Sequence, residues 1–307
     1  MSPHRIAVIG LGAISLRAHL PVIAAHPGFE IVASAEPRPV VVPAGGRLYH
    51  DHRAMLAAEP TIEAVAICTP PDVRGAIALD AIAAGKHVML EKPPASTLGE
   101  LRRIRAAAEQ AGVTVFAGWH SRFGLGVERA REVLAGEQVA SVEMIWRENA
   151  PTLHPDQAWM WRRGGFGVLE FGINGFSILT RILPDPLVVR AATLHVPLGS
   201  ETPIAAEIAF AGEREGDRLH AEMDWRAPAV TRTIEVLTRS GRRVWLGRTG
   251  QHLEVDGALL VDEPNLEYER MYDRFAALIE SGESELDDSP LVVVADAVLV
   301  GRTVAAP

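Results

Sequence analysis

A glycine-rich turn near the N-terminus carries the first chemical signal. Residues 10–15 read Gly-Leu-Gly-Ala-Ile-Ser and follow an apolar run that ends at Ile9. In such a turn Gly10 permits a tight bend and Gly12 lets the backbone approach a pyrophosphate closely. Ser15 stands where glycine or alanine is usual, which is a small departure because serine is also small. An ordinary glycine-rich turn is the alternative to the dinucleotide-binding turn that we predict, whose cofactor contacts are Gly10, Gly12, Ala13 and Ile14.

Two charged residues bear on which dinucleotide is bound. Glu36 lies 21 residues beyond Ser15, at the end of the next apolar run. An acidic side chain there accepts hydrogen bonds from the ribose hydroxyls of NAD and repels the 2′-phosphate of NADP, whereas Arg38 could bind that phosphate. A carboxylate beside a phosphate dianion is unfavourable. We therefore expect NAD as the cofactor, with NADP as the alternative. If Glu36 and Arg38 have no role in binding, they form a solvated pair on the surface.

Lys92 is the candidate base. It lies in Glu91-Lys92-Pro93, directly after a short apolar run, and Thr69-Pro70 ends the preceding run. The carboxyl ends of parallel strands are where open α/β sheets bind ligands. We expect Thr69 and Pro70 to form a wall for the nicotinamide and Glu91 to orient the lysine. A lysine that is partly desolvated beside a cationic nicotinamide can accept a proton, although a plain surface charge is the alternative.

A second group of polar and aromatic residues has the composition that a sugar site needs. Glu170 and Asn174 are four residues apart, so on a helix they share a face. Sugar hydroxyls need fixed donors and acceptors, and sugar C–H faces need aromatic walls. Each histidine or tryptophan taken singly is more often a structural residue. The candidates are Glu148, His154, Glu170, Asn174 and His120 for the hydroxyls, and Trp119, Trp159 and Trp225 for the walls.

The elements that must position these residues change character near residue 121. Before it, short apolar runs alternate with helical patterns, which predicts a doubly wound parallel sheet with helices on both faces. After it, strand-like runs dominate, which predicts a large, mostly antiparallel open sheet. Thr97 and Glu100 form a capping-box pair at the start of one helix. We expect an α/β protein with a dinucleotide-binding domain at 1–121 and a substrate-binding and oligomerisation domain at 122–307.

Composition excludes several classes of protein. The 307 residues are 48% hydrophobic and 22% charged, which argues against disorder, and the formal net charge of -9 disfavours nucleic-acid and anionic-membrane partners. The single cysteine, Cys68, excludes an internal disulfide. No apolar run reaches the roughly 18 residues of a membrane span, and no signal peptide is evident. We expect a cytoplasmic protein without a metal site, because His50 and His52 give no closed ligand set.

The chain resembles the Gfo/Idh/MocA oxidoreductase family. The resemblance rests on the glycine-rich turn, on Cys68-Thr69-Pro70-Pro71, and on residues 83–88 leading into Glu91-Lys92-Pro93. It implies an N-terminal Rossmann domain joined to an α/β domain with a large open sheet. In that family the open sheet usually makes a homodimer or homotetramer, which we expect here.

A narrower resemblance points to the family's sugar 1-dehydrogenase branch, of the D-galactose/L-arabinose type. It rests on residues 119–122, 146–148, 154–155, 159–161, 172–174, 203–206 and 224–225. It implies Trp161 beside the cofactor and Asn174 in place of the wider family's histidine. Glu170 stands where that family has aspartate, and Leu153 where the branch tends to have tryptophan, so the exact sugar is left open.

The resemblance implies oxidation of the C1 hydroxyl of an aldose to a lactone with NAD or NADP. Lys92 would take the hydroxyl proton, directly or through Glu170 or Asn174, and His120 would steady the lysine. Glu148 and His154 would bind more distant hydroxyls. A dehydrogenase of another polyol or sugar derivative, a regulator that binds the nucleotide without turnover, and a scaffold that kept only the fold are the alternatives.

Overall fold

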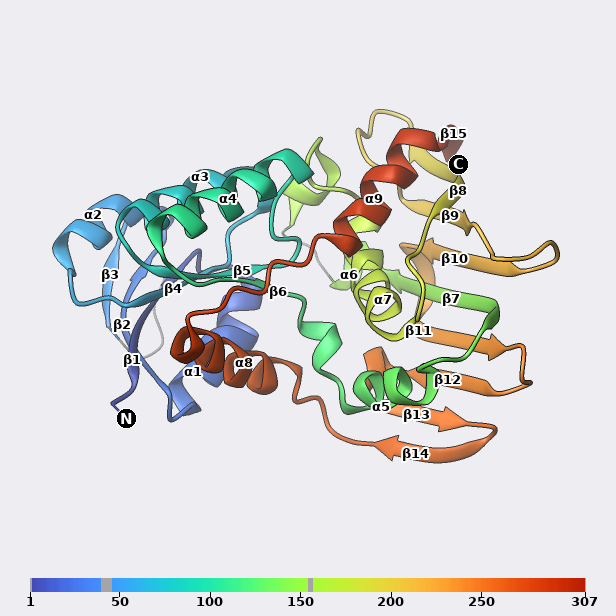
Figure 1. Ribbon diagram of the computed structural model, residues 1–307. Coiled ribbons are helices and arrows are strands. Elements are labelled where there is room, and N and C mark those ends of the chain that lie inside the picture. The colour runs from blue at the N-terminus through green and yellow to red at the C-terminus, as the bar shows by residue number, and fades with distance from the viewer. Residues whose placement is uncertain (1, 40–45, 154–156, 307) are drawn as a thin grey trace. The chain divides into compact units, whose positions relative to one another are not determined.

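The computed structural model describes residues 2–39, 46–153 and 157–306, which divide into two compact units (Figure 1). Unit 1 contains the residues up to His120 together with Tyr268–Asp288. Unit 2 contains Ser121–Glu267 and the residues from Ser289 onward. The expected second domain of 122–307 is therefore wrong for the segment 268–288, which packs with unit 1. In the described ranges no helix is long and apolar enough to cross a membrane.

Unit 1 is built on a parallel six-stranded sheet. Its order is β3-β2-β1-β4-β5-β6, and every pair is parallel. The direction of winding reverses between β1 and β4, which is the place where sheets of this kind bind ligands at the carboxyl ends of their strands. The strands are β1 (His4–Ile9), β2 (Phe29–Ala35), β3 (Arg47–Tyr49), β4 (Ala64–Ile67), β5 (His87–Glu91) and β6 (Val115–Gly118).

Helices cover both faces of this sheet, as predicted. Helices α2 (His52–Ala58), α3 (Pro71–Ala83) and α4 (Leu98–Ala111) lie on one face, and α1 (Leu20–Ala25) and α8 (Glu267–Ser281) lie on the other (Figure 1). The Thr97 side chain accepts the Glu100 N–H at 3.1 Å and so caps α4 as predicted. Asp72 lies in the first turn of α3 rather than at its cap, which is Pro70.

The late helix α8 joins unit 1 through aromatic packing. Its Phe275 lies between Phe29 of β2 and Phe116 of β6, with ring centroids 5.7 and 6.0 Å away and near-parallel planes. All three rings are buried. An amphipathic helix gains most of its stability from burying such an apolar face. Residues from three distant parts of the chain therefore make one core.

Unit 2 contains the predicted large sheet. Its nine strands run in the order β14-β13-β12-β11-β7-β10-β9-β8-β15. The pairs β7–β10 and β8–β15 are parallel, and the others are antiparallel. The strands are β7 (Val139–Asn149), β8 (Val189–Pro197), β9 (Ala205–Phe210), β10 (Arg218–Asp224), β11 (Arg226–Thr238), β12 (Arg243–Gly247), β13 (His252–Val255), β14 (Ala258–Asp262) and β15 (Arg302–Ala306). The predicted α/β fold class is confirmed.

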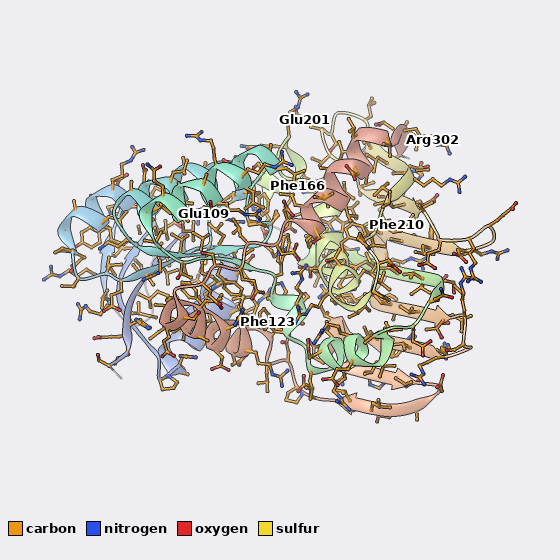
Figure 2. All side chains as sticks on the ribbon, in the orientation of Figure 1. Glu109, Phe123, Phe166, Glu201, Phe210 and Arg302 are labelled. Atoms are coloured by element: carbon orange, nitrogen blue, oxygen red, sulfur yellow. The ribbon has the colours of Figure 1, made fainter. Side chains whose placement is uncertain are left out.

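Helices α5 (Leu125–Leu134), α7 (Val168–Ile182) and α9 (Ser289–Val300) pack on one face of this sheet (Figure 1). Side chains fill the layer between these helices and the sheet, where Phe210 of β9 is labelled in Figure 2. The Phe176 ring of α7 meets the Phe210 ring edge-on, with centroids 6.2 Å apart. Helix α7 approaches the sheet closely because it carries two glycines. A Cβ at Gly172 would lie 2.0 Å from the Met223 sulfur, and one at Gly175 would lie 2.5 Å from the Met144 sulfur.

The Phe275→Ala substitution tests the docking of α8. Removing a fully buried phenylalanine leaves a cavity, so the free energy of unfolding should fall by about 3–5 kcal/mol. Phe275→Leu keeps most of the volume and should cost less than about half of that. Urea denaturation gives both values. A loss below about 1 kcal/mol for the alanine variant would show that α8 contributes little to the core.

Candidate functional site: a carboxyl-edge cluster in unit 1 and a polar helix face in unit 2

The glycine-rich turn has the geometry that the sequence predicts. Gly10 follows β1 with a φ of +91°, and a Cβ there would lie 2.9 Å from the Thr69 backbone nitrogen. The Ser15 hydroxyl donates to the Gly10 carbonyl at 2.5 Å and is buried, so this serine closes the turn where the usual pattern has glycine or alanine. At Gly12 a Cβ would meet nothing within 4 Å. The backbone there is open to a bound phosphate.

Glu36 is fixed by three donors of unit 1. Its carboxylate accepts the Leu11 N–H at 2.8 Å, the Arg38 N–H at 3.1 Å and the Arg38 guanidinium at 2.7 Å. Burial alone would raise the pKa of Glu36, but the hydrogen bonds from Arg38 and Leu11 lower it. Glu36 is therefore a buried, ionised acceptor. The Arg38 side chain is 67% exposed.

A buried arginine ties together the ends of two neighbouring strands. Arg74 of α3 is 3% exposed, and its guanidinium donates to the carbonyls of Thr69, Glu91 and Pro93. Thr69 follows β4, and Glu91 ends β5. The guanidinium's rigid fork suits several carbonyl acceptors at once. Arg74 therefore fixes the two turns that the sequence assigned to the nicotinamide and to the base, and its sequence position alone gave no signal of this.

Thr69 is suited to a further ligand. Its hydroxyl is buried and has no hydrogen-bond partner within the residues that the structure describes. A buried hydroxyl without a partner is costly, so such an atom indicates a missing acceptor or donor. Together with the open backbone at Gly12 and the acceptor Glu36, it fits a dinucleotide at this edge of the sheet.

Glu91 is a buried carboxylate at the end of β5. It is 3% exposed, and its Oε1 accepts the Tyr268 hydroxyl at 2.7 Å and lies 3.6 Å from His19 Nε2. Burial would raise the pKa of Glu91, but its hydrogen bond with His19 and its electrostatic interactions with His120 and Lys92 lower it to about 2. A buried carboxylate stays ionised only when such partners surround it. Glu91 is therefore ionised, and its charge acts on Lys92, the next residue of the chain.

His19 is the buried counterpart of Glu91. It is fully buried, and its Nδ1 lies 2.7 Å from the Tyr272 hydroxyl. Burial would lower the pKa of His19, but the Cys68 sulfur and the Glu91 carboxylate raise it to about 10. Burial also raises the pKa of Tyr272. The sequence pattern does not indicate His19, Tyr268 or Tyr272 as site residues, because their contacts depend on the docking of α8.

Lys92 is partly buried, between the buried Glu91 and Pro93. Only two of the chain's 30 basic residues are lysines, Lys86 and Lys92. The Lys86 ammonium donates to the carbonyls of Pro60 and Ile62 at 3.1 and 2.7 Å, which gives it a structural role. Lys92 is the lysine that lies with the cluster at the carboxyl edge.

His120 and Trp119 follow the last strand of the same sheet. The His120 ring stacks on the Tyr268 ring with centroids 5.0 Å apart. Trp119 is 2% exposed, and its indole N–H donates to the Asp287 carbonyl at 2.9 Å. This geometry gives Trp119 a role in the core of unit 1, and its predicted contact with the sugar stays a prediction.

Helix α7 carries the predicted polar pair of unit 2. Glu170 and Asn174 are both nearly buried, at 5% and 8% exposure. They lie on the face of the helix roughly opposite to Gly172, which packs on the sheet. The helix begins after Gly167, where a Cβ would lie 2.3 Å from the Pro203 carbonyl oxygen. The structure therefore brings Glu170 and Asn174 together, as predicted from their spacing.

The remaining candidates of unit 2 have strong structural partners. Glu148 is fully buried and accepts the Arg232 guanidinium at 2.7 Å. Trp225 is fully buried and meets Trp161 edge-on at 5.0 Å, and its indole nitrogen has no hydrogen-bond partner among the described residues. Trp159 is partly buried. His154 lies outside the described residues.

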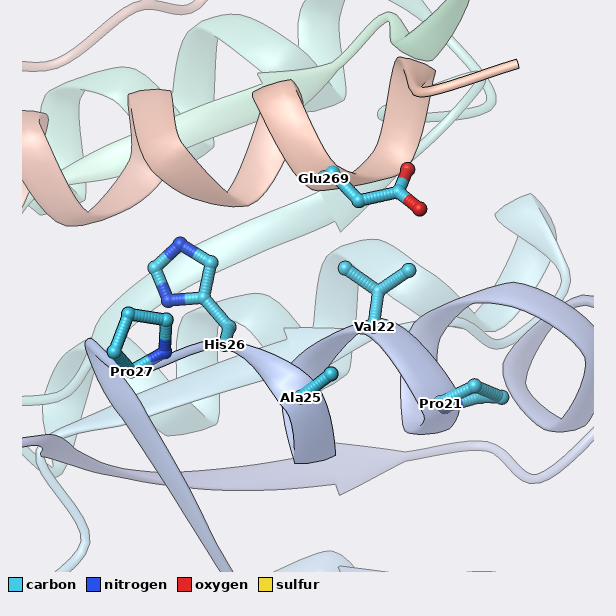
Figure 3. Close-up of a pocket in the computed structure, with 6 residues that line it drawn as sticks. All are labelled: Pro21, Val22, Ala25, His26, Pro27 and Glu269. Atoms are coloured by element: carbon cyan, nitrogen blue, oxygen red, sulfur yellow. The ribbon is translucent and has the colours of Figure 1, made fainter. Parts of the chain in front are cut away.

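The described residues contain no group of three or more His, Cys, Asp or Glu side chains able to hold a metal ion. A shallow pocket on α1 and α8 holds none of the predicted site residues (Figure 3). Its lining residues are Pro21, Val22, Ala25, His26, Pro27 and Glu269.

Comparison with known proteins agrees with this geometry. Residues 4–119 match the "Oxidoreductase family, NAD-binding Rossmann fold". A galactose 1-dehydrogenase of Pseudomonas fluorescens is 35% identical over 312 residues, which is 99% of this chain and 98% of that protein. The chain belongs to the Gfo/Idh/MocA oxidoreductase family. The expected family membership is thereby confirmed.

Two solved structures extend the comparison. The D-galactose-1-dehydrogenase of Rhizobium etli is 42% identical with a TM-score of 0.92, covering 100% of this chain and 97% of that one. A 3-ketoreductase of Actinomadura kijaniata in complex with NADP is 20% identical with a TM-score of 0.84, covering 100% of both chains. This second likeness shows the fold alone.

The charge of His19 should make stability depend on pH. Its pKa is raised from 6.5 to about 10 in the folded chain, so its stabilisation is complete below pH 6.5 and is lost as the pH rises through 10. We expect the free energy of unfolding to fall between pH 6.5 and 10, and to fall less in His19→Gln. Urea denaturation at several pH values measures both slopes. Equal slopes would show that His19 is not charged in the folded chain.

Proposed function

We propose that the chain oxidises the anomeric carbon of an aldose to the lactone, with a galactose-configured sugar as substrate and NAD as the preferred cofactor. The observation that carries this proposal is Lys92, which follows a buried strand at the carboxyl edge of the sheet, directly after the buried and ionised Glu91. Full-length identity of 35% and 42% to two galactose 1-dehydrogenases supports the substrate class.

The reaction divides into a proton transfer and a hydride transfer. When bound, the oxidised nicotinamide supplies the hydride acceptor at its C4. We assign Lys92 the role of the base that accepts the proton of the C1 hydroxyl as that carbon loses its hydride. Asn174 holds the same hydroxyl, and Glu170 accepts a hydrogen bond from the sugar or relays its proton. The C1–O single bond becomes the carbonyl of the lactone, so protons and electrons balance.

The cofactor is held by residues already described in unit 1. The backbone at Gly10, Gly12, Ala13 and Ile14 would take the pyrophosphate, and Glu36 the adenosine ribose. Thr69 offers its unpaired hydroxyl near the nicotinamide, with Pro70 beside it. Trp161 keeps its predicted place near the cofactor as part of this proposal.

Two departures from the branch bear on the sugar. Glu170 is longer than aspartate by one methylene, which moves the carboxylate by about 1–1.5 Å, and Leu153 is exposed on α6 (Ala150–Leu153). A preference for L-arabinose or D-fucose is therefore part of the test.

Two alternative functions remain open to the same assays. If the chain is a dehydrogenase of another polyol or sugar derivative, turnover is expected outside the aldoses. If it is a regulator, it should bind the nucleotide without turnover. A homodimer or homotetramer in the cytoplasm also stays a prediction.

Substitution of Lys92 tests the base. In assays of D-galactose, L-arabinose, D-fucose, D-glucose, D-xylose and myo-inositol with each cofactor, Lys92→Ala should lower kcat by roughly 10²–10⁴-fold. Lys92→Arg should be equally impaired, because arginine keeps its proton. Lys86→Ala is the matched control and should keep the wild-type kcat. Activity of Lys92→Arg near the wild-type level would contradict the assignment.

The Glu36–Arg38 pair tests the choice of cofactor. Arg38→Ala leaves Glu36 without its counter-charge, so kcat/KM for NADP should fall roughly tenfold, the effect of about 1.4 kcal/mol, with little change for NAD. Glu36→Ala should shift the ratio toward NADP. Arg53→Ala is the control, since Arg53 is similarly exposed, at 70%, and pairs with Asp80 at 2.8 Å. Equal changes for both cofactors would contradict this role.

A further inference from the structure

One buried residue of unit 1 contacts several groups of the candidate site without being assigned to it. Tyr268, at the start of α8, is 9% exposed. Its hydroxyl donates to Glu91 Oε1 at 2.7 Å. The His120 ring stacks on the Tyr268 ring, with centroids 5.0 Å apart. The His19 ring meets the Tyr268 ring edge-on, also with centroids 5.0 Å apart. Tyr268 is the only described residue with all three of these contacts.

We propose that Tyr268 is a positioning residue for Lys92, acting through the Glu91 carboxylate and the His120 ring. The inference rests on the proposed function, because it assumes that Lys92 is the base. A base that accepts a proton becomes an ammonium, and a fixed carboxylate next to it stabilises that developing charge. Such a carboxylate helps only if it is held in place before the reaction starts.

The two halves of tyrosine serve the two contacts separately. The hydroxyl gives Glu91 a short hydrogen bond of the strong, charge-assisted kind. The flat ring gives His120 a stacking surface. Phenylalanine would keep the second contact and lose the first, whereas leucine would lose both. The substitutions therefore separate the effect on Glu91 from the effect on His120.

The polar groups around Glu91 come from separate parts of unit 1. His19 belongs to η1 (Ser15–His19), His120 to η2 (His120–Phe123) and Tyr268 to α8, and Lys92 follows β5. Arg74 of α3 binds the backbone carbonyl of Glu91 rather than its carboxylate. Loss of the Tyr268 hydroxyl removes a neutral donor that lies within hydrogen-bond distance of the ionised carboxylate, and so should raise the pKa of Glu91.

The chain offers a closely matched control. Tyr49 donates its hydroxyl to Glu59 Oε1 at 2.8 Å, the same donor and acceptor as in the Tyr268–Glu91 bond. Tyr49 lies on β3 and takes no part in the proposed reaction. Tyr49→Phe and Tyr268→Phe therefore delete the same hydrogen bond at an unrelated place and at the proposed one.

We expect Tyr268→Phe to lower kcat roughly tenfold, with the sugar KM and the NAD dissociation constant within about twofold of the wild type. Its kcat should also fall at acidic pH values where the wild-type kcat holds. Tyr268→Leu should lose more activity than Tyr268→Phe. Tyr49→Phe should keep the wild-type kcat and pH profile. Thermal unfolding of all four proteins identifies any loss of fold.

A second measurement does not need turnover. Because Lys86 and Lys92 are the only lysines, acetylation by acetic anhydride can be followed at each by mass spectrometry, with Lys86 as the internal reference. Without a fixed carboxylate, the Lys92 amine should be acetylated faster relative to Lys86 in Tyr268→Phe than in the wild type, and unchanged in Tyr49→Phe.

The outcomes separate the two proposals. If the wild type oxidises an aldose and Lys92→Ala does not, but Tyr268→Phe matches Tyr49→Phe in kcat and labelling, the positioning role is wrong and the proposed function stands. If no aldose is oxidised, the proposed function fails, and an unchanged acetylation ratio in Tyr268→Phe would overturn the positioning of Lys92 as well. A rise in KM without a change in kcat would also overturn it.

Discussion

The ionised carboxylate of Glu91, held out of water at the end of β5, is the constraint on which the site of unit 1 depends. A buried charge without partners costs several kcal/mol, on the order of 3–5 when one partner of a pair is lost. Glu91 therefore needs donors, and they come from opposite ends of the chain: His19 lies in the first helical segment and Tyr268 lies 177 residues beyond Glu91. Glu91 therefore stays ionised only when α8 is docked, because α8 carries Tyr268. The buried phenylalanine contacts around Phe275 hold α8 in place.

A second constraint fixes the backbone that carries these groups. Arg74 binds three carbonyl oxygens from the turns after β4 and β5. The same turn after β4 meets Gly10 so closely that only a glycine fits there. The turns after β1, β4 and β5 are therefore linked through Thr69 and Arg74.

Local chemistry explains how far the sequence could predict this structure. The glycine-rich turn, the Thr97 cap of α4 and the shared face of Glu170 and Asn174 follow from spacings of five residues or fewer, and the structure has all three. The alternation of strands and helices likewise indicates the parallel sheet. The short strand β3 and the helix α2 lack a strong apolar period and were missed.

Contacts over long separations were beyond the sequence pattern. Helix α8 lies within the predicted second domain of 122–307, because nothing in its residues indicates that its apolar face covers the sheet of unit 1. The contacts of Tyr268 and Tyr272 with His19, which explain why His19 is buried, could therefore not be predicted. Glu148 shows the same limit: its sequence position predicts a sugar contact, which stays a prediction, but does not indicate that the Arg232 guanidinium pairs with its carboxylate.

The scarcity of lysine sharpens the argument for Lys92. With only two lysines among 30 basic residues, this chain meets nearly all its needs for positive charge with arginine. Arginine serves as well or better wherever a fixed charge or several donors are needed, as Arg74 and Arg38 show. What arginine cannot do is release and regain a proton near neutral pH. Lys86 ties two carbonyls of a loop, a task that asks only for donors. Lys92 lies instead directly after the buried, ionised Glu91, whose carboxylate interacts with it electrostatically. At that place a lysine can exchange a proton, which an arginine could not do.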